Sequence, residues 1–223
     1  MTLTIGILLF PNVQQLDLTA PYEVFASLPG TRVLLVWKDL GAVTASTGLT
    51  LLPSATFAGC PPLDVLCVPG GAGVNPLLED AEVLAFVRAQ AAQARFVTSV
   101  CTGALVLGAA GLLQGRRATT HWMALDLLAA FGAIPTCERV VRDGPLITAG
   151  GVTAGIDFGL SLIAELRGRT AAEAVQLALE YAPAPPFAAG TPDSAPAEVV
   201  ALVRERLSGA RRAREEIIGR ICG

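Results

Sequence analysis

Cys101 is the residue best placed for covalent chemistry in this sequence. It stands between an apolar run that predicts a strand over residues 95–100 and a segment that predicts a helix over 103–112. Such a sharp strand-to-helix turn, a nucleophile elbow, exposes its central side chain and aims the next backbone N–H at it. A thiol at a helix N-terminus also feels the positive end of the helix dipole, which favours the thiolate. The alternative is a buried cysteine without a chemical role, since free cysteine is often buried.

Asp17 is the second candidate, because it and Glu23 are the two charges in the first 30 residues. Its functional interpretation is an acid or base beside Cys101, since burial and a neighbouring thiolate would both raise the pKa of the carboxyl. The alternative is an N-cap on a helix predicted over residues 18–28, because Asp is a preferred residue there.

Gly70, Gly71 and Ala72 follow a strand predicted over residues 64–68. The two glycines would let a ligand approach the backbone, and their N–H groups could form an oxyanion site. A tight turn that requires glycine explains them equally well. Because ligands in an open parallel sheet bind beyond the carboxyl ends of the strands, we expect this segment, Asp17 and Cys101 to meet at one rim.

His121 is the one histidine of the chain, so a Cys–His pair would depend on it entirely. We favour a structural, hydrogen-bonded histidine over a general base, and therefore a thiol chemistry that does not use histidine. The cysteines are too scattered to complete a zinc site around a single histidine, so no metal site is predicted.

Composition narrows the class of protein. The 223 residues are 52% hydrophobic and 16% charged, which fits one compact α/β domain with at most a short appendage. Lys and Arg number 16 against 19 Asp and Glu, a net charge of −3. Without a basic excess to neutralise phosphates, nucleic-acid binding is not expected.

A chain this apolar could also contain a membrane-spanning helix. The uncharged window 96–115 contains Thr98, Ser99, Thr102 and four glycines, so it fits two elements better than one membrane span. The first residues lack the basic start and cleavage site of a signal peptide. Five cysteines without a CxxC pair fit free thiols in a reducing compartment, and we expect a cytoplasmic protein.

Strand and helix patterns alternate along the chain. They predict strands over 3–9 and 32–38, a hairpin at a sheet edge over 42–57, strands over 136–142 and 145–149, and helices over 75–94, 121–131, 154–167 and 171–181. Such alternation implies parallel βαβ units. The expected fold is α/β, a flavodoxin-like three-layer sandwich with a mostly parallel sheet and helices on both faces.

The expected domain organisation has three parts. Residues 1–181 form the α/β domain, 182–197 a proline-rich connector, and 198–223 a charged amphipathic helix. That helix packs either on its own domain or on a second subunit. It is too short for a two-helix DNA-reading unit.

Five segments in order resemble the DJ-1/PfpI superfamily, which has the class I glutamine-amidotransferase-like fold. They are LFPNVQQLDLTAPYEVF (9–25), VPGGAG (68–73), SVCTGALVLGAAGLL (99–113), GRRATTHW (115–122) and TAGGVTAGIDFGL (148–160). Within it, the segments are most similar to the isonitrile hydratase group. Thr102 stands where the PfpI proteases have histidine, which argues against peptidase activity. Many relatives carry Glu where this chain has Asp17, and Asp matches the hydratase group.

The resemblance implies hydration of an isonitrile to the N-substituted formamide, with Cys101 as nucleophile and Asp17 as general acid and base. It further implies that Thr102 orients Asp17 or water and that the N–H groups of Gly71 and Thr102 stabilise developing charge. Residues 70–72, Ile156 and Tyr181 are expected to shape the substrate pocket. No metal or organic cofactor is implied, and a homodimer is expected. The alternatives are a cofactor-independent glyoxalase and an oxidation-responsive protein that acts through Cys101.

Overall fold

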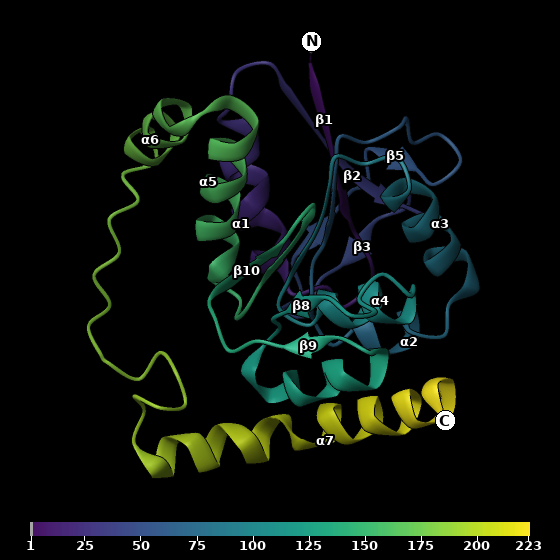
Figure 1. Ribbon diagram of the computed structural model, residues 1–223, viewed down its shortest axis with the longest axis vertical. Coiled ribbons are helices and arrows are strands. Elements are labelled where there is room, and N and C mark those ends of the chain that lie inside the picture. Colours follow the sequence, from purple (N-terminus) through teal and green to yellow (C-terminus); the bar gives the residue numbers. More distant parts are fainter. Residues whose placement is uncertain (1) are drawn as a thin grey trace.

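The computed structural model describes residues 2–223 (Figure 1). Within those residues, seven strands form one sheet in the order β10-β11-β7-β6-β1-β2-β5. The strands are β1 (Leu3–Leu8), β2 (Thr31–Trp37), β5 (Ala55–Thr56), β6 (Val65–Val68), β7 (Phe96–Val100), β10 (Val140–Asp143) and β11 (Leu146–Ala149). Neighbours pair in parallel except β10, which is antiparallel to β11.

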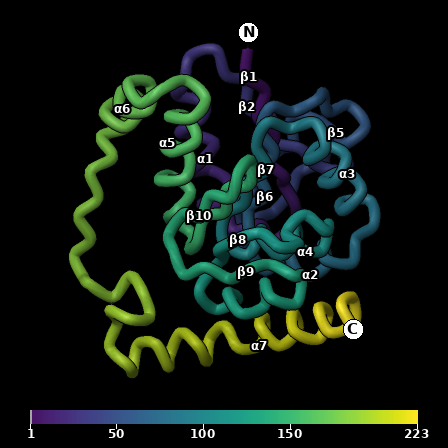
Figure 2. The backbone as a smooth tube through the Cα atoms, viewed as in Figure 1, coloured from purple at the N-terminus to yellow at the C-terminus, as the bar shows by residue number. Residues whose placement is uncertain are grey.

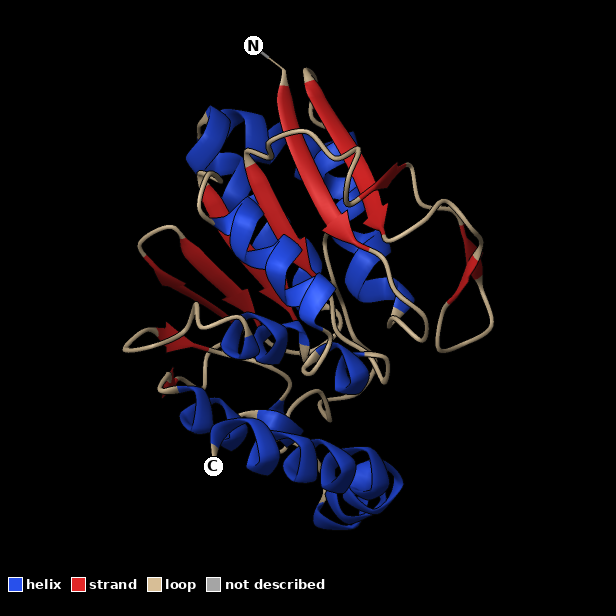
Figure 3. Cartoon of the chain, turned by 90° about the vertical axis from the view of Figure 1, so that its right-hand side faces the viewer, coloured by secondary structure: helices blue, strands red, loops and turns tan. Residues whose placement is uncertain are grey.

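Helices cover both faces of this sheet. On one side lie α1 (Gln15–Ala26) and α5 (Ala154–Arg167), and on the other lie α3 (Ala81–Ala91) and α4 (Gly103–Ala109) (Figures 1 and 3). Helix α6 (Arg169–Ala178) packs against α5. The predicted three-layer α/β sandwich is confirmed. Strand β6 is a continuous apolar run with all four side chains buried, as expected where a sheet is covered by helices on both faces.

The region 42–57 differs in detail from the prediction. Strands β3 (Val43–Thr44) and β4 (Thr50–Leu51) do form a hairpin, but as a separate two-stranded sheet. The edge of the main sheet is β5 instead. The hairpin is held by the loop after β1, since the Asn12 N–H donates to the Thr44 carbonyl and the Ser46 N–H to the Val13 carbonyl, both at 2.9 Å.

The single helix predicted over 75–94 is wrong. A short α2 (Val74–Leu77) ends early, and α3 begins after Asp80, whose carboxylate accepts the Val83 N–H at 3.1 Å as an N-cap. Asn75, where the predicted helix was to begin, lies inside α2. Its side chain is used in contacts with the C-terminal helix, described below.

The helix predicted over 121–131 is interrupted and is not an α-helix, because this segment forms two 3₁₀ helices, η1 (Trp122–Ala124) and η2 (Asp126–Phe131). The Nδ1 atom of His121 accepts the Met123 N–H at 3.3 Å and starts the first turn. Arg211 donates to the Met123 carbonyl oxygen, an acceptor that a regular α-helix would use itself. The minor strands β8 (Arg117–Ala118) and β9 (Ile134–Pro135) flank this region.

The C-terminal part of the chain returns to the rim where the sheet strands end. After α6 the backbone runs in an extended path along the outside of the domain, and α7 (Ala197–Cys222) then crosses below the ends of α2 and the η turns (Figures 1 and 2). In this structure α7 packs on its own chain. None of the helices within residues 2–223 has the length and apolar character needed to cross a membrane.

Candidate active site

Cys101 occupies the sharp turn between β7 and α4, and the predicted nucleophile elbow is confirmed. Its φ of +53° lies in the left-handed region, which residues other than glycine adopt rarely. The backbone is fixed there from both sides. The Cys101 N–H donates to the Ala149 carbonyl at 3.0 Å, and the Cys101 carbonyl accepts the Thr120 hydroxyl at 2.6 Å. A strained backbone held by such bonds is typical of functional sites.

Asp17 lies in the first turn of α1, not at its N-cap, which is Gln14. Its side chain is completely buried, and its Oδ2 atom accepts the Gly70 N–H at 2.9 Å. Oδ1 makes no hydrogen bond of good geometry within residues 2–223, although the Cys101 thiol lies beside the carboxyl. Burial raises the pKa of Asp17 from 3.8 to about 7, against the opposing effects of the Gly70 N–H and of Cys101.

The thiol of Cys101 is also largely withdrawn from solvent, although 6% of the residue is exposed and it lines the cavity described below. Burial raises its pKa well above 9, and the nearby Asp17 charge raises it further. The Thr102 N–H and the positive charge of Arg214 oppose that shift. The position at a helix N-terminus therefore does not by itself make Cys101 a thiolate. The carboxyl and thiol form a coupled pair, so ionisation of one disfavours ionisation of the other.

Gly70, Gly71 and Thr102 complete the surroundings of this pair. The Thr102 hydroxyl accepts the Gly71 N–H at 3.0 Å. At Gly70 a Cβ atom would lie 2.8 Å from Asp17 Oδ2 and 2.5 Å from the Thr102 nitrogen, so no side chain fits. The Gly70 and Gly71 N–H groups thus bind Asp17 and Thr102 in this structure, and an oxyanion role for Gly71 requires its N–H to change partner.

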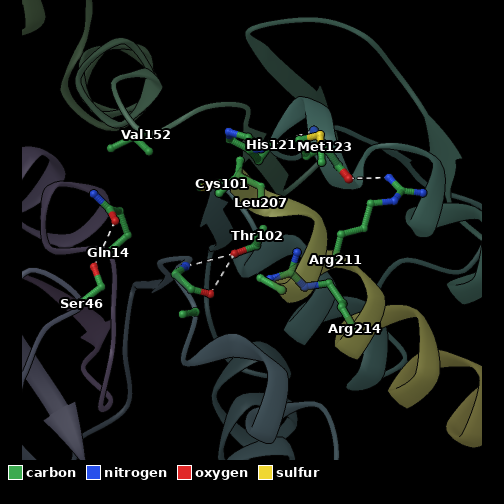
Figure 4. A pocket seen from close by; sticks show the side chains of 13 residues that line it. Gln14, Ser46, Cys101, Thr102, His121, Met123, Val152, Leu207, Arg211 and Arg214 are labelled. Carbon is green, nitrogen blue, oxygen red and sulfur yellow. Dashed lines mark hydrogen bonds between the residues drawn. The ribbon is translucent and has the colours of Figure 1, made fainter. Parts of the chain in front are cut away.

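A cavity of about 250 Å³ opens beside Cys101 (Figure 4). Its lining is mainly apolar or uncharged, as expected for a small-molecule site. The lining residues are Gln14, Ser46, Gly71, Ala72, Cys101, Thr102, His121, Met123, Val152, Leu207, Ala210, Arg211 and Arg214. The predicted positions 71, 72, 101 and 102 therefore line one cavity. Gly70 and Asp17 do not line it, which corrects the expectation that Gly70 contacts the substrate.

Helix α7 supplies a wall of this cavity that the sequence analysis missed. Leu207, Ala210, Arg211 and Arg214 all come from it. Asn75 joins the helix to the domain, donating to the Ala210 carbonyl at 3.3 Å and accepting from Arg214 Nε at 3.0 Å. The available sequence signal was the amphipathic spacing over 198–220, which indicates a helix that packs on something but not on what.

Ile156 and Tyr181 do not line the cavity, which corrects the expectation for both. They border a separate depression between α1 and α5, together with Leu16 and Thr19. Tyr181 is held there because its hydroxyl donates to the Asp157 carboxylate at 3.2 Å. Val152, in the loop before α5, is the residue of this region that reaches the cavity.

His121 does line the cavity, but its geometry fits a structural residue. Its Nδ1 accepts the Met123 N–H, and no hydrogen bond joins it to Cys101 in the described structure. Burial, with the charge of Arg214, lowers its pKa, so the ring is neutral. Across residues 2–223, no three His, Cys, Asp or Glu side chains gather in a way that could hold a metal ion.

Comparison with known proteins agrees with this geometry. A sequence model of the DJ-1/PfpI family matches residues 4–165. The chain belongs to the DJ-1/PfpI family. Among DJ-1/PfpI relatives, isonitrile hydratase from Pseudomonas putida is 65% identical over 220 residues, covering 99% of this chain and 96% of that protein.

Solved DJ-1/PfpI structures have the same fold. The crystal structure of a THiJ/PfpI family protein from Pseudomonas syringae is 48% identical with a TM-score of 0.96, covering 98% of this chain and 91% of the other. That similarity extends over α7 as well as the sheet domain. Drosophila melanogaster DJ-1beta, 24% identical with a TM-score of 0.75, covers 82% of this chain and shares the fold.

Proposed function

We propose that this chain is an isonitrile hydratase, which converts an isonitrile and water to the N-substituted formamide. The observation that carries the proposal is the 65% identity to the Pseudomonas putida isonitrile hydratase over nearly the full length of both proteins. The buried pair of a thiol and a carboxyl beside a small apolar cavity supports it, because the reaction needs a nucleophile and a proton at the same carbon.

The first step joins the substrate to Cys101. The proton shared by the pair moves to Asp17, and the thiolate attacks the terminal isonitrile carbon. Asp17 gives its proton to that carbon, so a C–S and a C–H bond form and a thioimidate, R–N=CH–S, remains on Cys101. The carboxyl is suited to this step because its pKa of about 7 allows it to hold a proton near neutral pH.

The second step releases the formamide. Ionised Asp17 takes a proton from water as the oxygen attacks the thioimidate carbon, and it passes that proton to the nitrogen. The tetrahedral intermediate then collapses: the C–S bond breaks, Asp17 takes the hydroxyl proton, and Cys101 leaves as thiolate. Cys101, Asp17 and water account for every bond and proton, so this scheme uses no metal or organic cofactor.

Thr102 and residues 70–72 support the pair in this scheme. The Gly70 N–H holds one carboxyl oxygen of Asp17 and aims the carboxyl at the reacting carbon. The Thr102 side chain orients Asp17 or the water, and the Thr102 N–H, which lies beside the sulfur, stabilises the thiolate. The Gly71 N–H stabilises developing charge after it has left the Thr102 hydroxyl. Gly71 and Ala72 contact the substrate as part of the cavity.

We propose that the protein acts in the cytoplasm as a homodimer without a nucleic-acid or membrane partner. Five free cysteines support a reducing compartment, and the net charge of −3 argues against a nucleic-acid partner. The proposed organisation is a domain over 1–181, a connector over 182–197 and a helix over 198–223.

Light scattering tests the proposed homodimer, and a single monomer peak at working concentration contradicts it.

The deciding experiment is turnover of cyclohexyl isonitrile by purified, reduced protein, with formamide followed by chromatography. We expect formamide from the wild type and none above background from Cys101→Ala, with both proteins folded by circular dichroism. Absence of formamide from folded wild type overturns the proposal. Turnover of methylglyoxal would then indicate the glyoxalase. A peroxide-induced mass increase at Cys101 without any turnover would instead indicate the oxidation-responsive protein.

A further inference from the structure

Arg214 is a buried cation in the wall of the substrate cavity. Its side chain extends from α7 toward the elbow that carries Cys101 and Thr102 (Figure 4), and 6% of the residue's surface is exposed. Its Nε donates to Asn75 Oδ1 at 3.0 Å. Among residues 2–223, Arg214 forms no ion pair, its side-chain hydrogen bond is made through Nε alone, and the charges that act on it are those of Cys101 and Arg211 rather than a carboxylate. A guanidinium buried without an anion is costly.

Arg211, one turn earlier on α7, differs from Arg214 because its charge is balanced by acidic side chains. It forms a two-pronged ion pair with Asp126, at 2.9 and 2.7 Å, and a further bond with Glu215 at 2.8 Å. Neither acid lines the cavity. The other titratable groups that line it are Cys101 and a neutral His121. The Arg214 charge therefore has no carboxylate partner among the side chains that line the cavity, and the anion nearest to it is the one that the Cys101–Asp17 pair holds when it shares a single proton.

We propose that Arg214 is an anion subsite, and that the preferred substrates are isonitriles that carry a carboxylate. This inference rests on the proposed function and names its substrate class. The planar guanidinium, already fixed through Nε, presents its remaining donors in the geometry that a carboxylate accepts. The isonitrile carbon would lie at Cys101 while the carboxylate lies at Arg214, and the apolar lining would hold the chain between them.

A different role is stabilisation of the Cys101 thiolate alone, since the Arg214 charge acts against the raised pKa of that thiol. The two roles are separable. A thiolate-stabilising charge affects charged and neutral substrates alike. An anion subsite affects the ratio between them.

The first test compares straight-chain isonitriles that end in a carboxylate with the matching primary amides, which have nearly the same shape. We expect the wild type to prefer the best carboxylate by roughly ten- to hundredfold in kcat/KM, the size of a hydrogen bond to a charged group. Arg214→Gln should bring that ratio toward one, and Arg214→Lys should retain part of it. Arg220→Gln, on the same helix and paired with exposed Glu79, is the control for charge loss on α7.

The second test does not depend on isonitrile turnover. Iodoacetate and iodoacetamide both lose iodide to the Cys101 thiolate from the same kind of carbon, and they differ in a carboxylate against an amide. Mass spectrometry of the Cys101 peptide gives the ratio of their rates, which is independent of the thiolate fraction. We expect Arg214→Gln to lower the iodoacetate-to-iodoacetamide ratio about tenfold or more relative to wild type and Arg220→Gln.

The outcomes separate the two proposals. If wild type hydrates neither the carboxylates nor the amides, the proposed function fails, and the alkylation ratio still tests Arg214. If both kinds of isonitrile are hydrated but the ratio is near one, or is the same in Arg214→Gln, Arg214→Lys and wild type, the anion subsite is wrong.

Discussion

The carboxyl of Asp17 lies beside the thiol of Cys101, with Asp17 completely buried and Cys101 largely buried at the wall of the cavity. Burial raises the pKa of Asp17 to about 7 and the pKa of Cys101 well above 9, and each anion disfavours the other. Near neutral pH the pair therefore keeps at least one proton. That is the protonation state required by a reaction in which the sulfur attacks a carbon that must also gain a proton.

The first prediction concerns the dependence of kcat/KM on pH. The pair is productive with one proton, so kcat/KM should rise as pH increases through about 7, where the second proton leaves Asp17. It should fall again at alkaline pH, where the last proton leaves. A pH series with cyclohexyl isonitrile checks this, and a flat profile from pH 5 to 9 would contradict a shared proton.

Asp17→Asn should separate formation of the nucleophile from protonation of carbon. Removing the carboxylate removes a charge that raises the pKa of Cys101, so alkylation of Cys101 by iodoacetamide at pH 8 should become faster. Hydration should nevertheless fall roughly 10²–10⁴-fold, because the proton donor is lost. If turnover persists in this variant, Asp17 is not the acid.

The same substitution should make the folded protein more stable at neutral and higher pH. The folded-state pKa of Asp17 is raised, so the folded state binds more protons than the unfolded state between pH 4 and about 7, and stability falls across that window. The Asp17→Asn variant cannot ionise at this position, so its stability does not fall across that window, and its side-chain oxygen still accepts the Gly70 N–H. Urea unfolding should show the variant roughly 3–4 kcal/mol more stable than wild type at pH 8, a gap that shrinks toward pH 4. A gap that does not change with pH would refute the raised pKa.

The left-handed backbone at Cys101 predicts an unusual order of stability among its variants. Glycine adopts a φ of +53° without strain, whereas alanine does not. Cys101→Gly should therefore be about 1 kcal/mol more stable than Cys101→Ala, with both inactive. Thermal or urea unfolding of the two proteins measures this directly, and the reverse order would show that the turn relaxes when the thiol is removed.

Thr102 can be tested through its bond to Gly71. Thr102→Val keeps the shape of the side chain but removes the hydroxyl that positions the Gly71 N–H and that orients Asp17 or the water in the proposed reaction, whereas Thr102→Ser keeps that hydroxyl. We expect kcat/KM to fall about ten- to hundredfold in the valine variant and to recover largely in the serine variant. Equal activity in both would limit Thr102 to its backbone N–H.

His121→Asn tests the structural assignment of the histidine. The asparagine oxygen can accept the Met123 N–H in place of Nδ1, so the η1 turn should persist. Loss of a general base would cost 10²-fold or more in kcat. We expect a decrease of less than about tenfold, and a larger one in a folded variant would restore the Cys–His alternative.

Much of the fold could be predicted because its signals are local. Buried strands such as β6 and β7 are short apolar runs, and the helix over 154–167 matches α5 at both ends. The errors came where side chains bond across long sequence distances. The predicted helix over 75–94 begins at Asn75, but that side chain bonds Ala210 and Arg214 of α7. Arg211 likewise takes a carbonyl that the predicted helix over 121–131 would have needed.

The sequence by itself determined the α/β class, the Cys101 elbow and the approach of Asp17 and residues 70–72 to it, because parallel strands bring their carboxyl ends to one rim. Only the tertiary structure decided that α7 closes the cavity, that Arg214 lies inside it, and that Ile156 and Tyr181 lie elsewhere. The spacing of apolar residues along a helix specifies which face of that helix must be buried. It does not specify which segment covers that face, because this depends on contacts between residues far apart in the sequence.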